Sequence, residues 1–461
     1  MKKFLLLAIA VLLSGCAVGP NYKRPTADVP TGYRGAMPAQ PATPSLGNEK
    51  WWDVYQDPVL TQLIHIALQQ NYDVRIAATR VLEAQAQLGI TRANQFPSAS
   101  AGAGVFSQQN AKVSSVFPAY EVNAGQLNLS VIWNLDFWGK YRRQTEAARA
   151  ELLATEWGQQ AVISSLVANV ATAYFQLRAL DAELEIAKRT LGSRQQSLQL
   201  TRVLETHGSA SDLDVSQSEQ LVYTASETIP DLERQIQQQE NLLSILLGQN
   251  PGSIPRGRAL TEQPVPGSVP AGLPSELLER RPDVREVEAN VMAANAQIGV
   301  AKAAFFPSLS LTGTGGLESN VLQHFLQQPS QTWSAGFNIT QPIFEGGALR
   351  SQLRLARAQW QESVLSYEQT VQDALQQVSN GLVAYQKDRE FREQQELLAQ
   401  AAERSDRLSL VLYKQGGASY LQVLTNETNY FSAELNLVDA QLNERLALVQ
   451  LYQSLGGGWQ Q

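Results

Sequence analysis

The side chains that most often support catalysis or metal binding occur singly in this chain. The three histidines, His65, His207 and His324, are far apart, and none has a partner histidine at the spacing of a metal site. The glycine-rich stretch 313–316 lacks the strand–helix–strand unit that a dinucleotide fingerprint requires, and the sequence has no P-loop or HExxH motif. The sequence therefore predicts no enzyme, no bound metal and no cofactor.

Cys16, the only cysteine, has a different chemistry available to it. Two lysines at positions 2 and 3 precede an apolar stretch, 4–12, that is too short to span a bilayer. Leu13-Ser14-Gly15-Cys16 follows, with small residues before the cysteine. This order is typical of a bacterial lipoprotein signal, so we expect cleavage before Cys16 and attachment of lipid to it. Ala17, in place of an aspartate, favours sorting to the outer membrane.

Charge and hydropathy exclude two further classes. The formal net charge is −7 and becomes −9 once Lys2 and Lys3 are removed with the signal, which is the opposite of the basic surface that nucleic acids need. After the signal, no apolar run approaches the roughly 20 residues of a membrane helix. We therefore expect neither a nucleic-acid partner nor a helical membrane span.

The chain also repeats itself. Asp-Val-Arg at 73 and 283, Gln-Leu-Gly-Ile at 87 matching Gln-Ile-Gly-Val at 297, and Phe-Pro-Ser at 96 and 306 share one offset. A further block at 208–215 matches 416–423. These matches indicate an ancestral unit duplicated in tandem, so that each structure built by one half is built again by the other.

Each half contains one very long helical stretch. The segment 141–205 has no proline and would extend roughly 100 Å at the rise of an α-helix, and 349–415 is its counterpart. Apolar residues recur every seven positions at 184–198 and 435–449, which is typical of a coiled-coil seam. Shorter helical stretches are expected at about 60–95, 212–247, 275–304 and 418–455.

Four segments alternate apolar and polar residues. They lie at about 98–109, 121–135, 308–319 and 331–344, and Leu129, Val131 and Trp133 illustrate the pattern. Period two gives a strand with one apolar and one polar face, and the lengths suit tilted membrane strands. Because no helix is patterned to cover the apolar face, lipid contact is favoured over a half-buried soluble sheet.

The expected domain organisation follows from these patterns. A lipoprotein signal peptide, 1–15, precedes a lipidated extended arm, 16–55. The first structural repeat, 56–249, and the second, 275–461, each hold helices and two strands. A proline-rich linker, 250–274, joins them. Four strands cannot close a barrel, and open edges in lipid leave backbone groups unpaired, so we expect several chains to assemble.

In these features the chain resembles outer-membrane efflux channels of the TolC/OprM type, in their lipoprotein branch (NodT-like outer-membrane factors). The resemblance spans essentially the whole mature chain. It rests on the lipoprotein signal, the paired Phe-Pro-Ser blocks, Val18-Gly19-Pro20-Asn21-Tyr22-Lys23-Arg24-Pro25, Trp51-Trp52, Tyr413-Lys414-Gln415-Gly416-Gly417 and Leu455-Gly456-Gly457-Gly458-Trp459.

The resemblance implies an α+β membrane protein that forms a homotrimer. Four strands per chain would make a 12-stranded transmembrane β-barrel, continuous with a long periplasmic α-helical barrel and a mixed equatorial region. It implies an exit channel in the outer membrane of a Gram-negative cell, extending into the periplasm. The channel would passively conduct drugs or other small toxic compounds, delivered by an inner-membrane pump of RND type and a periplasmic adaptor protein, and would contribute to antibiotic resistance.

The resemblance also implies a periplasmic gate near the turns at 207–209 and 415–417. The matching positions are Asp212, Asp214, Tyr413, Lys414, Leu421 and Thr425. A ring of three Leu421 side chains would form a dry constriction, whereas rings of carboxylates would favour cations. Helix capping is the alternative role for Asp212, and seam packing is the alternative for Leu421. Thr425 and Thr428 stand where family members often have aspartate and arginine, so we expect a weaker acidic ring and different locks between chains.

Two other functions remain open at this stage. The same channel architecture serves protein (type I) secretion or metal-ion efflux, because selectivity lies largely in the pump. A periplasmic coiled-coil lipoprotein without a pore is the structural alternative, and the four alternating strands argue against it.

Overall fold

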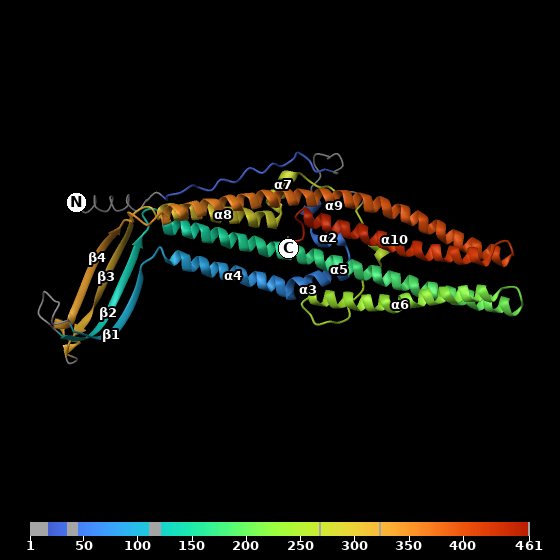
Figure 1. Cartoon of the computed structure of the whole chain (residues 1–461), viewed down its shortest axis with the longest axis horizontal. Coiled ribbons are helices and arrows are strands. Elements are labelled where there is room, and N and C mark those ends of the chain that lie inside the picture. The colour runs from blue at the N-terminus through green and yellow to red at the C-terminus, as the bar shows by residue number, and fades with distance from the viewer. Residues whose placement is uncertain (1–16, 35–44, 110–120, 267–268, 322–323, 460–461) are drawn as a thin grey trace. The chain divides into compact units, whose positions relative to one another are not determined.

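The structure is a computed structural model that describes residues 17–34, 45–109, 121–266, 269–321 and 324–459 (Figure 1). Cys16 and the signal peptide expected before it lie outside these residues. The elements, in chain order, are η1 Leu46–Asn48, α2 Trp51–Tyr55, α3 Pro58–Gln70, α4 Tyr72–Ala93, β1 Ser98–Gln109, β2 Glu121–Leu135, α5 Lys140–Thr206, α6 Asp212–Leu246, η2 Leu260–Glu262, α7 Pro274–Arg280, α8 Pro282–Ala303, β3 Ser308–Ser319, η4 Gln328–Ser330, β4 Gln331–Thr340, α9 Ala348–Lys414 and α10 Tyr420–Ser454.

The chain divides into two compact units, and each takes segments from both halves of the repeat. The sheet unit holds the described residues up to 26 together with 80–156 and 286–368. The hairpin unit holds the described residues of 27–79, 157–285 and 369–461. The units therefore do not coincide with the two repeats that the sequence predicts.

Two of the expected helices are each broken in two. The stretch 60–95 forms α3 and α4, because the side chain of Asn71 accepts hydrogen bonds from the amides of Asp73 (2.8 Å) and Val74 (3.2 Å) and caps a new helix. The stretch 275–304 forms α7 and α8, because Arg281 precedes Pro282 and is held extended at ψ 121°. Both stretches are helical, as the sequence predicts, with one break in each.

The four strands form one antiparallel sheet in the order β1-β2-β3-β4 (Figure 1). Leu129 pairs with Ala101 on one side and with Gly315 on the other. Leu311 likewise pairs with Trp133 and with Phe337. This register puts the apolar positions of all four strands on one face, as the period-two pattern predicts.

The opposite face of the sheet is polar and is bonded across the strands. The hydroxyls of Ser100 and Ser130 lie 2.8 Å apart, and those of Thr314 and Ser334 lie 2.6 Å apart. The fourth strand, expected to reach 344, ends at Thr340. Pro342 lies just beyond, and it has no amide with which to continue the ladder.

The apolar face of the sheet is open in this chain. Every residue of β1 is exposed, and all but one residue of β4 is exposed. Val105 is 89% exposed and Trp333 is 83% exposed, although side chains of this kind are usually covered. No helix of the described residues is both long enough and apolar enough to cross a membrane.

The hairpin unit is built from two pairs of helices, α5 with α6 and α9 with α10 (Figure 1). Of the seven-residue positions, Leu198 and Val449 are buried. The other four are half-buried, namely Leu184, Leu191, Leu435 and Leu442. Ala179 and Ile186 of α5 form one apolar cluster with Val438 of α10. The seam therefore joins helices of the two repeats.

Asp57 connects three segments of the hairpin unit. Its buried carboxylate caps α3 by accepting from the amides of Val59 (2.8 Å) and Leu60 (3.3 Å). It also accepts from the hydroxyl of Tyr174 on α5 (3.1 Å) and from the amide nitrogen of Gln263 (2.6 Å). Burial alone would raise the pKa of Asp57. The hydrogen bonds that its carboxylate accepts, above all the one from Gln263, outweigh burial and lower the pKa.

A half-buried carboxylate, Glu183, lies in the sequence of α5 between Ala179 and Ile186 of the apolar cluster that includes Val438. Burial raises the pKa of Glu183 on α5 to about 7, and the nearby charge of Asp439 on α10 adds to the rise. Burial also raises the pKa of Asp439. The folded chain therefore favours the protonated form of Glu183, which costs least to bury beside a second acid.

We predict that the contribution of Glu183 to the free energy of unfolding falls as pH rises from 4.5 to about 7. Glu183 has a higher pKa in the folded chain than its usual 4.5, so its favourable contribution is complete below pH 4.5 and is lost as pH rises towards 7. Thermal unfolding midpoints of Glu183→Gln, measured from pH 5 to 8, should fall less steeply with pH than those of the wild type. Glu185→Gln, an exposed position on the same helix, is the control. Identical slopes for Glu183→Gln and the wild type would disprove the assignment.

Candidate functional site

The two helix pairs turn in the same way at their tips. Gly208 and Gly416 have φ of +69° and +76°, a left-handed conformation that glycine adopts without strain. Ser211 and Ser419 then cap α6 and α10, each through its side-chain oxygen. The tips are therefore structural copies, and any functional difference between them comes from side chains.

The two aspartates at the first tip have different roles. The Asp214 carboxylate accepts from the amide and from the hydroxyl of Ser211, each at 2.8 Å, and the Asp214 amide donates to the Ser211 hydroxyl (3.2 Å). This reciprocal pair is a capping box. Asp212 is exposed in the first turn, where the helix dipole favours its charge. The capping role considered for Asp212 therefore belongs to Ser211 and Asp214.

Tyr420 links the two tips. Its hydroxyl lies 2.5 Å from that of Ser218 on α6, and its ring packs against Tyr413 with centroids 5.1 Å apart. Burial raises the pKa of Tyr413, and the charge of Asp214 adds to the rise. The structure therefore brings Tyr413 and Asp214 together, with Tyr420 buried beside them.

Tyr420 was not among the predicted site residues. The signal for it in the sequence was the comparison of the two copies, since Tyr420 occupies the position that Asp212 holds in the first half.

Three of the predicted residues project into solvent from the second tip. Leu421 is 61% exposed, and Lys414 and Thr425 are exposed as well. Leu421 is therefore not packed in a seam of this chain, unlike its neighbours Val423 and Leu424. The Thr425 hydroxyl donates to the Leu421 carbonyl (2.8 Å), so both side chains lie on one face of α10.

Glu427 does not supply the carboxylate that Thr425 lacks. One of its oxygens accepts from the Ser197 hydroxyl of α5 (3.0 Å), and burial raises the pKa of Glu427. The Thr428 hydroxyl donates to the Leu424 carbonyl of its own helix (2.9 Å). The exposed face of α10 at this tip therefore carries Leu421 beside the polar but uncharged Thr425 and Thr428.

A second region of interest is the arm at the start of the described chain. The Val18 amide donates to the Trp138 carbonyl (3.0 Å). Arg143 of α5 donates to the Asn21 side chain (2.9 Å) and, at 3.4 Å each, to the Val18 and Gly19 carbonyls. A Cβ on Gly19 would lie 2.5 Å from the Cα of Gly299 on α8, so only glycine fits this contact.

The same arm is fixed at its other end by one buried carboxylate. Glu288 of α8 accepts from the Tyr22 hydroxyl (3.2 Å) and from the Arg24 guanidinium (2.9 Å). Ala17, at the near end, lies against Gly139, the residue just before α5. The arm therefore places the residue that follows Cys16 at the turn from sheet to helix.

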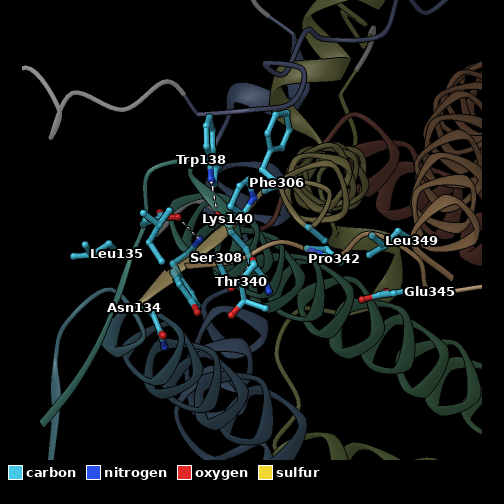
Figure 2. A pocket seen from close by; sticks show the side chains of 16 residues that line it. Asn134, Leu135, Trp138, Lys140, Phe306, Ser308, Thr340, Pro342, Glu345 and Leu349 are labelled. Carbon is cyan, nitrogen blue, oxygen red and sulfur yellow. Dashed lines mark hydrogen bonds between the residues drawn. The ribbon is translucent and has the colours of Figure 1, made fainter. Parts of the chain in front are cut away.

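A cavity of about 400 Å³ opens at this turn (Figure 2). The Trp138 and Phe306 rings stack at one end with centroids 4.8 Å apart, and the Trp138 ring N–H donates to the Pro307 carbonyl (2.8 Å). Glu345 and Leu349 lie at the other end. The lining comes from the ends of strands and helices and includes the charged residues Asp136, Lys140 and Glu345. Within the described residues, no group of three or more metal-ligating side chains occurs.

Comparisons with known proteins agree with this geometry. The family described as "Outer membrane efflux protein" matches residues 63–249 and 273–457, one range on each side of the proline-rich segment. The antibiotic efflux pump outer membrane protein ArpC of Pseudomonas putida is 36% identical over 465 residues, which cover 99% of this chain and 96% of that protein. The cation efflux system protein CusC of Escherichia coli is 35% identical over 463 residues, covering 100% and 99%.

Solved structures of this kind share the fold. The open state of the MtrE outer membrane channel of Neisseria gonorrhoeae is 30% identical, with a TM-score of 0.87 over 96% of this chain and 99% of that one. The duplicated α+β fold expected from the sequence is thus the fold of known outer-membrane channels. The chain belongs to the family of outer membrane efflux proteins and is an exit channel of the outer membrane.

Proposed function

We propose that this protein is the lipid-anchored, trimeric exit channel of a tripartite efflux system, and that it conducts small toxic compounds passively. The observation that supports assembly of several copies is the open sheet, and the number three is the one that the family resemblance implies. Its apolar face is exposed on all four strands, and both edge strands have one neighbour only among the described residues. In lipid, unpaired edge groups cost several kcal/mol each, so the edges must pair with other copies. Three copies would supply twelve strands, which suffices for a closed, water-filled barrel.

The lipid anchor is proposed at Cys16. The arm that follows it is bonded to α5 and α8, so Ala17 is fixed beside Gly139 at the end of the strands. Strand ends of a transmembrane sheet lie at the membrane surface, which is where a diacylglyceryl group on Cys16 would insert. Mass spectrometry of the mature protein should find Cys16 lipidated and N-terminal, and an unprocessed N-terminus would contradict the proposal.

The gate is proposed at the second tip. Leu421 and Thr425 face outwards on α10, and the nearby Glu427 faces α5 instead. Rings of Leu421 from several chains would form an apolar constriction that excludes water and ions. Asp214 and Tyr413 support this surface from within the chain, while Asp212 and Lys414 carry exposed charges near it.

The partners proposed are a periplasmic adaptor protein and an inner-membrane pump, of the RND type. A channel of this kind contains no motor, and its chain offers no nucleotide-binding motif, so energy must come from the pump. The substrate class stays with the pump for the same reason. The names of similar proteins mention antibiotics and cations. For this channel, antibiotics and similar small toxic compounds are the proposed substrates.

Deletion of the gene, followed by complementation, tests the proposed function. Loss of the channel should increase susceptibility to antibiotics and dyes several-fold, and the wild-type gene should restore resistance. If deletion changes the susceptibility to metal ions alone, the substrates are metal cations and not drugs. Unchanged susceptibility to all of these compounds, with impaired secretion of a protein, would refute the proposal.

Leu421→Ala tests the gate. Removing most of three large side chains widens an apolar constriction, so single-channel conductance in planar bilayers should rise at least twofold. Leu213→Ala is the matched control, because Leu213 is the counterpart of Leu421 in the first repeat and is similarly exposed at 64%. Conductance that is unchanged in Leu421→Ala, or raised equally in both variants, would remove Leu421 from the gate.

A further inference from the structure

The cavity at the turn from sheet to helix has no role in the proposed function (Figure 2). Its volume of about 400 Å³ falls within the range of small-ligand sites, roughly 300–1,000 Å³. All of its lining belongs to the sheet unit and comes from the termini of β2, β3, β4, α5, α8 and α9 and the turns between them. These termini meet where a transmembrane sheet leaves the bilayer, so the cavity lies at the level of the lipid headgroups.

The cavity continues the apolar face of the sheet. Leu135 pairs with Leu309, and Leu309 pairs with Ile339, so one row of apolar side chains crosses three strands at the ends nearest the helices. Leu135 and Leu309 line the cavity, and Ile339 is exposed. Ile343 and Phe344, just beyond β4, are exposed as well. A lipid whose acyl chains cover this face would therefore have its headgroup at the cavity.

The aromatic part of the lining is typical of a membrane interface. Trp138 and Tyr141 are of the two residue types that are enriched at headgroup level. The ring N–H of Trp138 is already bonded to the Pro307 carbonyl, and its ring stacks on Phe306, which is itself 37% exposed. The aromatic wall therefore offers ring faces to a ligand and no hydrogen-bond donor from Trp138.

The charged side chains of the lining balance one another. The Asp136 carboxylate accepts from the backbone amides of Tyr141 (3.1 Å) and Arg142 (2.8 Å) and is ion-paired with the Arg142 guanidinium (3.4 Å). The lining then holds one further cation, Lys140, and one further anion, Glu345. Both are exposed, and neither has an ion-pair partner in the part of the chain that the structure describes. The cavity therefore suits a ligand with one charge of each sign better than a simple anion or cation.

Two other cations are close in sequence without lining the cavity. Lys302 precedes the lining residue Ala303, and Arg350 follows the lining residue Leu349. Both cations are exposed. They leave the balance between Lys140 and Glu345 within the cavity unchanged.

Lys140 and Glu345 each occur in one repeat only. The helices α5 and α9 begin at 140 and 348, so Lys140 corresponds to Ala348, and Glu345 corresponds to Phe137. Duplication therefore does not produce this pair of charges twice. Each chain has one such pair, with the cation at the first strand-to-helix turn and the anion at the second.

We propose that this cavity binds the headgroup of a zwitterionic phospholipid, phosphatidylethanolamine, at one site per chain. The phosphate of the lipid pairs with the Lys140 ammonium, and the primary ammonium of the lipid donates to the Glu345 carboxylate. Its acyl chains cover the apolar row at Leu135 and Leu309. The bound lipid joins the corresponding turns of the two repeats and so stabilises the sheet unit.

Lipid titration of the purified full-length protein tests this site. The protein is delipidated in mild detergent and titrated with phosphatidylethanolamine, phosphatidylglycerol or phosphatidylcholine of the same acyl chains, and native mass spectrometry counts the bound lipid. Phosphatidylethanolamine should saturate at one per chain and bind several-fold more tightly than the other two. Phosphatidylglycerol has no ammonium group, and the methylated ammonium of phosphatidylcholine has no proton to donate. Absence of saturable binding, or binding of either other lipid that is as tight, would overturn the proposal.

Two variants separate the two charged contacts. Lys140→Gln removes the partner of the phosphate, so it should weaken phosphatidylethanolamine and phosphatidylglycerol alike, by roughly tenfold. Glu345→Gln should weaken phosphatidylethanolamine alone, and the preference over phosphatidylglycerol should disappear. Glu362→Gln, an exposed position on α9 outside the cavity, is the control and should bind as the wild type does. Wild-type lipid preference in both Lys140→Gln and Glu345→Gln would refute the site.

Glycerophosphoethanolamine distinguishes a membrane lipid from a soluble phosphodiester. It carries the same two charges without acyl chains, so a tenfold excess over the lipid should displace little of the bound phosphatidylethanolamine. Displacement in proportion to its concentration would show that the cavity recognises the soluble headgroup alone, and would contradict its assignment to a membrane lipid.

Discussion

The outer strands of the sheet, β1 and β4, each have one hydrogen-bonded neighbour among the described residues. Their outward amides and carbonyls must bond to something, and lipid offers no partner. The register places the apolar side chains of the four strands on one face of the sheet. Exposure of that face to water is unfavourable. A single chain therefore satisfies neither its edges nor its apolar face.

Duplication gives each chain two similar helix pairs, and the structure shows where the copies diverge. The first tip uses Ser211 and Asp214 for a capping box, whereas the second has Ser419 and Gln422 at those positions. Tyr420 fills the space between the tips and bonds to Ser218. Near-identical backbones at the two tips thus carry different surfaces, through the few positions at which the copies differ.

Long, periodic elements could be predicted from the sequence, because period and length are properties of the chain itself. α5 and α9 differ from their expected bounds by one residue at each end, and β1 to β3 begin and end where alternation does. The breaks at Asn71 and Arg281 were missed because a cap and a residue before proline act locally, within an otherwise helical pattern. The role of Tyr420 depends on contacts between distant segments, such as its hydrogen bond with Ser218. No spacing in the sequence encodes such contacts.

Disulfide formation between β1 of one copy and β4 of the next tests the central claim most directly. Cysteines would replace Ala101 on β1 and, in turn, Ala335 and its neighbours on β4, in full-length protein in outer membranes. Closure of the sheet by three copies predicts covalent dimers and trimers on oxidation, no larger species, and no such products when either cysteine is present alone. Products that stay monomeric at every β4 position tested would show that the edges do not meet between copies, and would contradict the account.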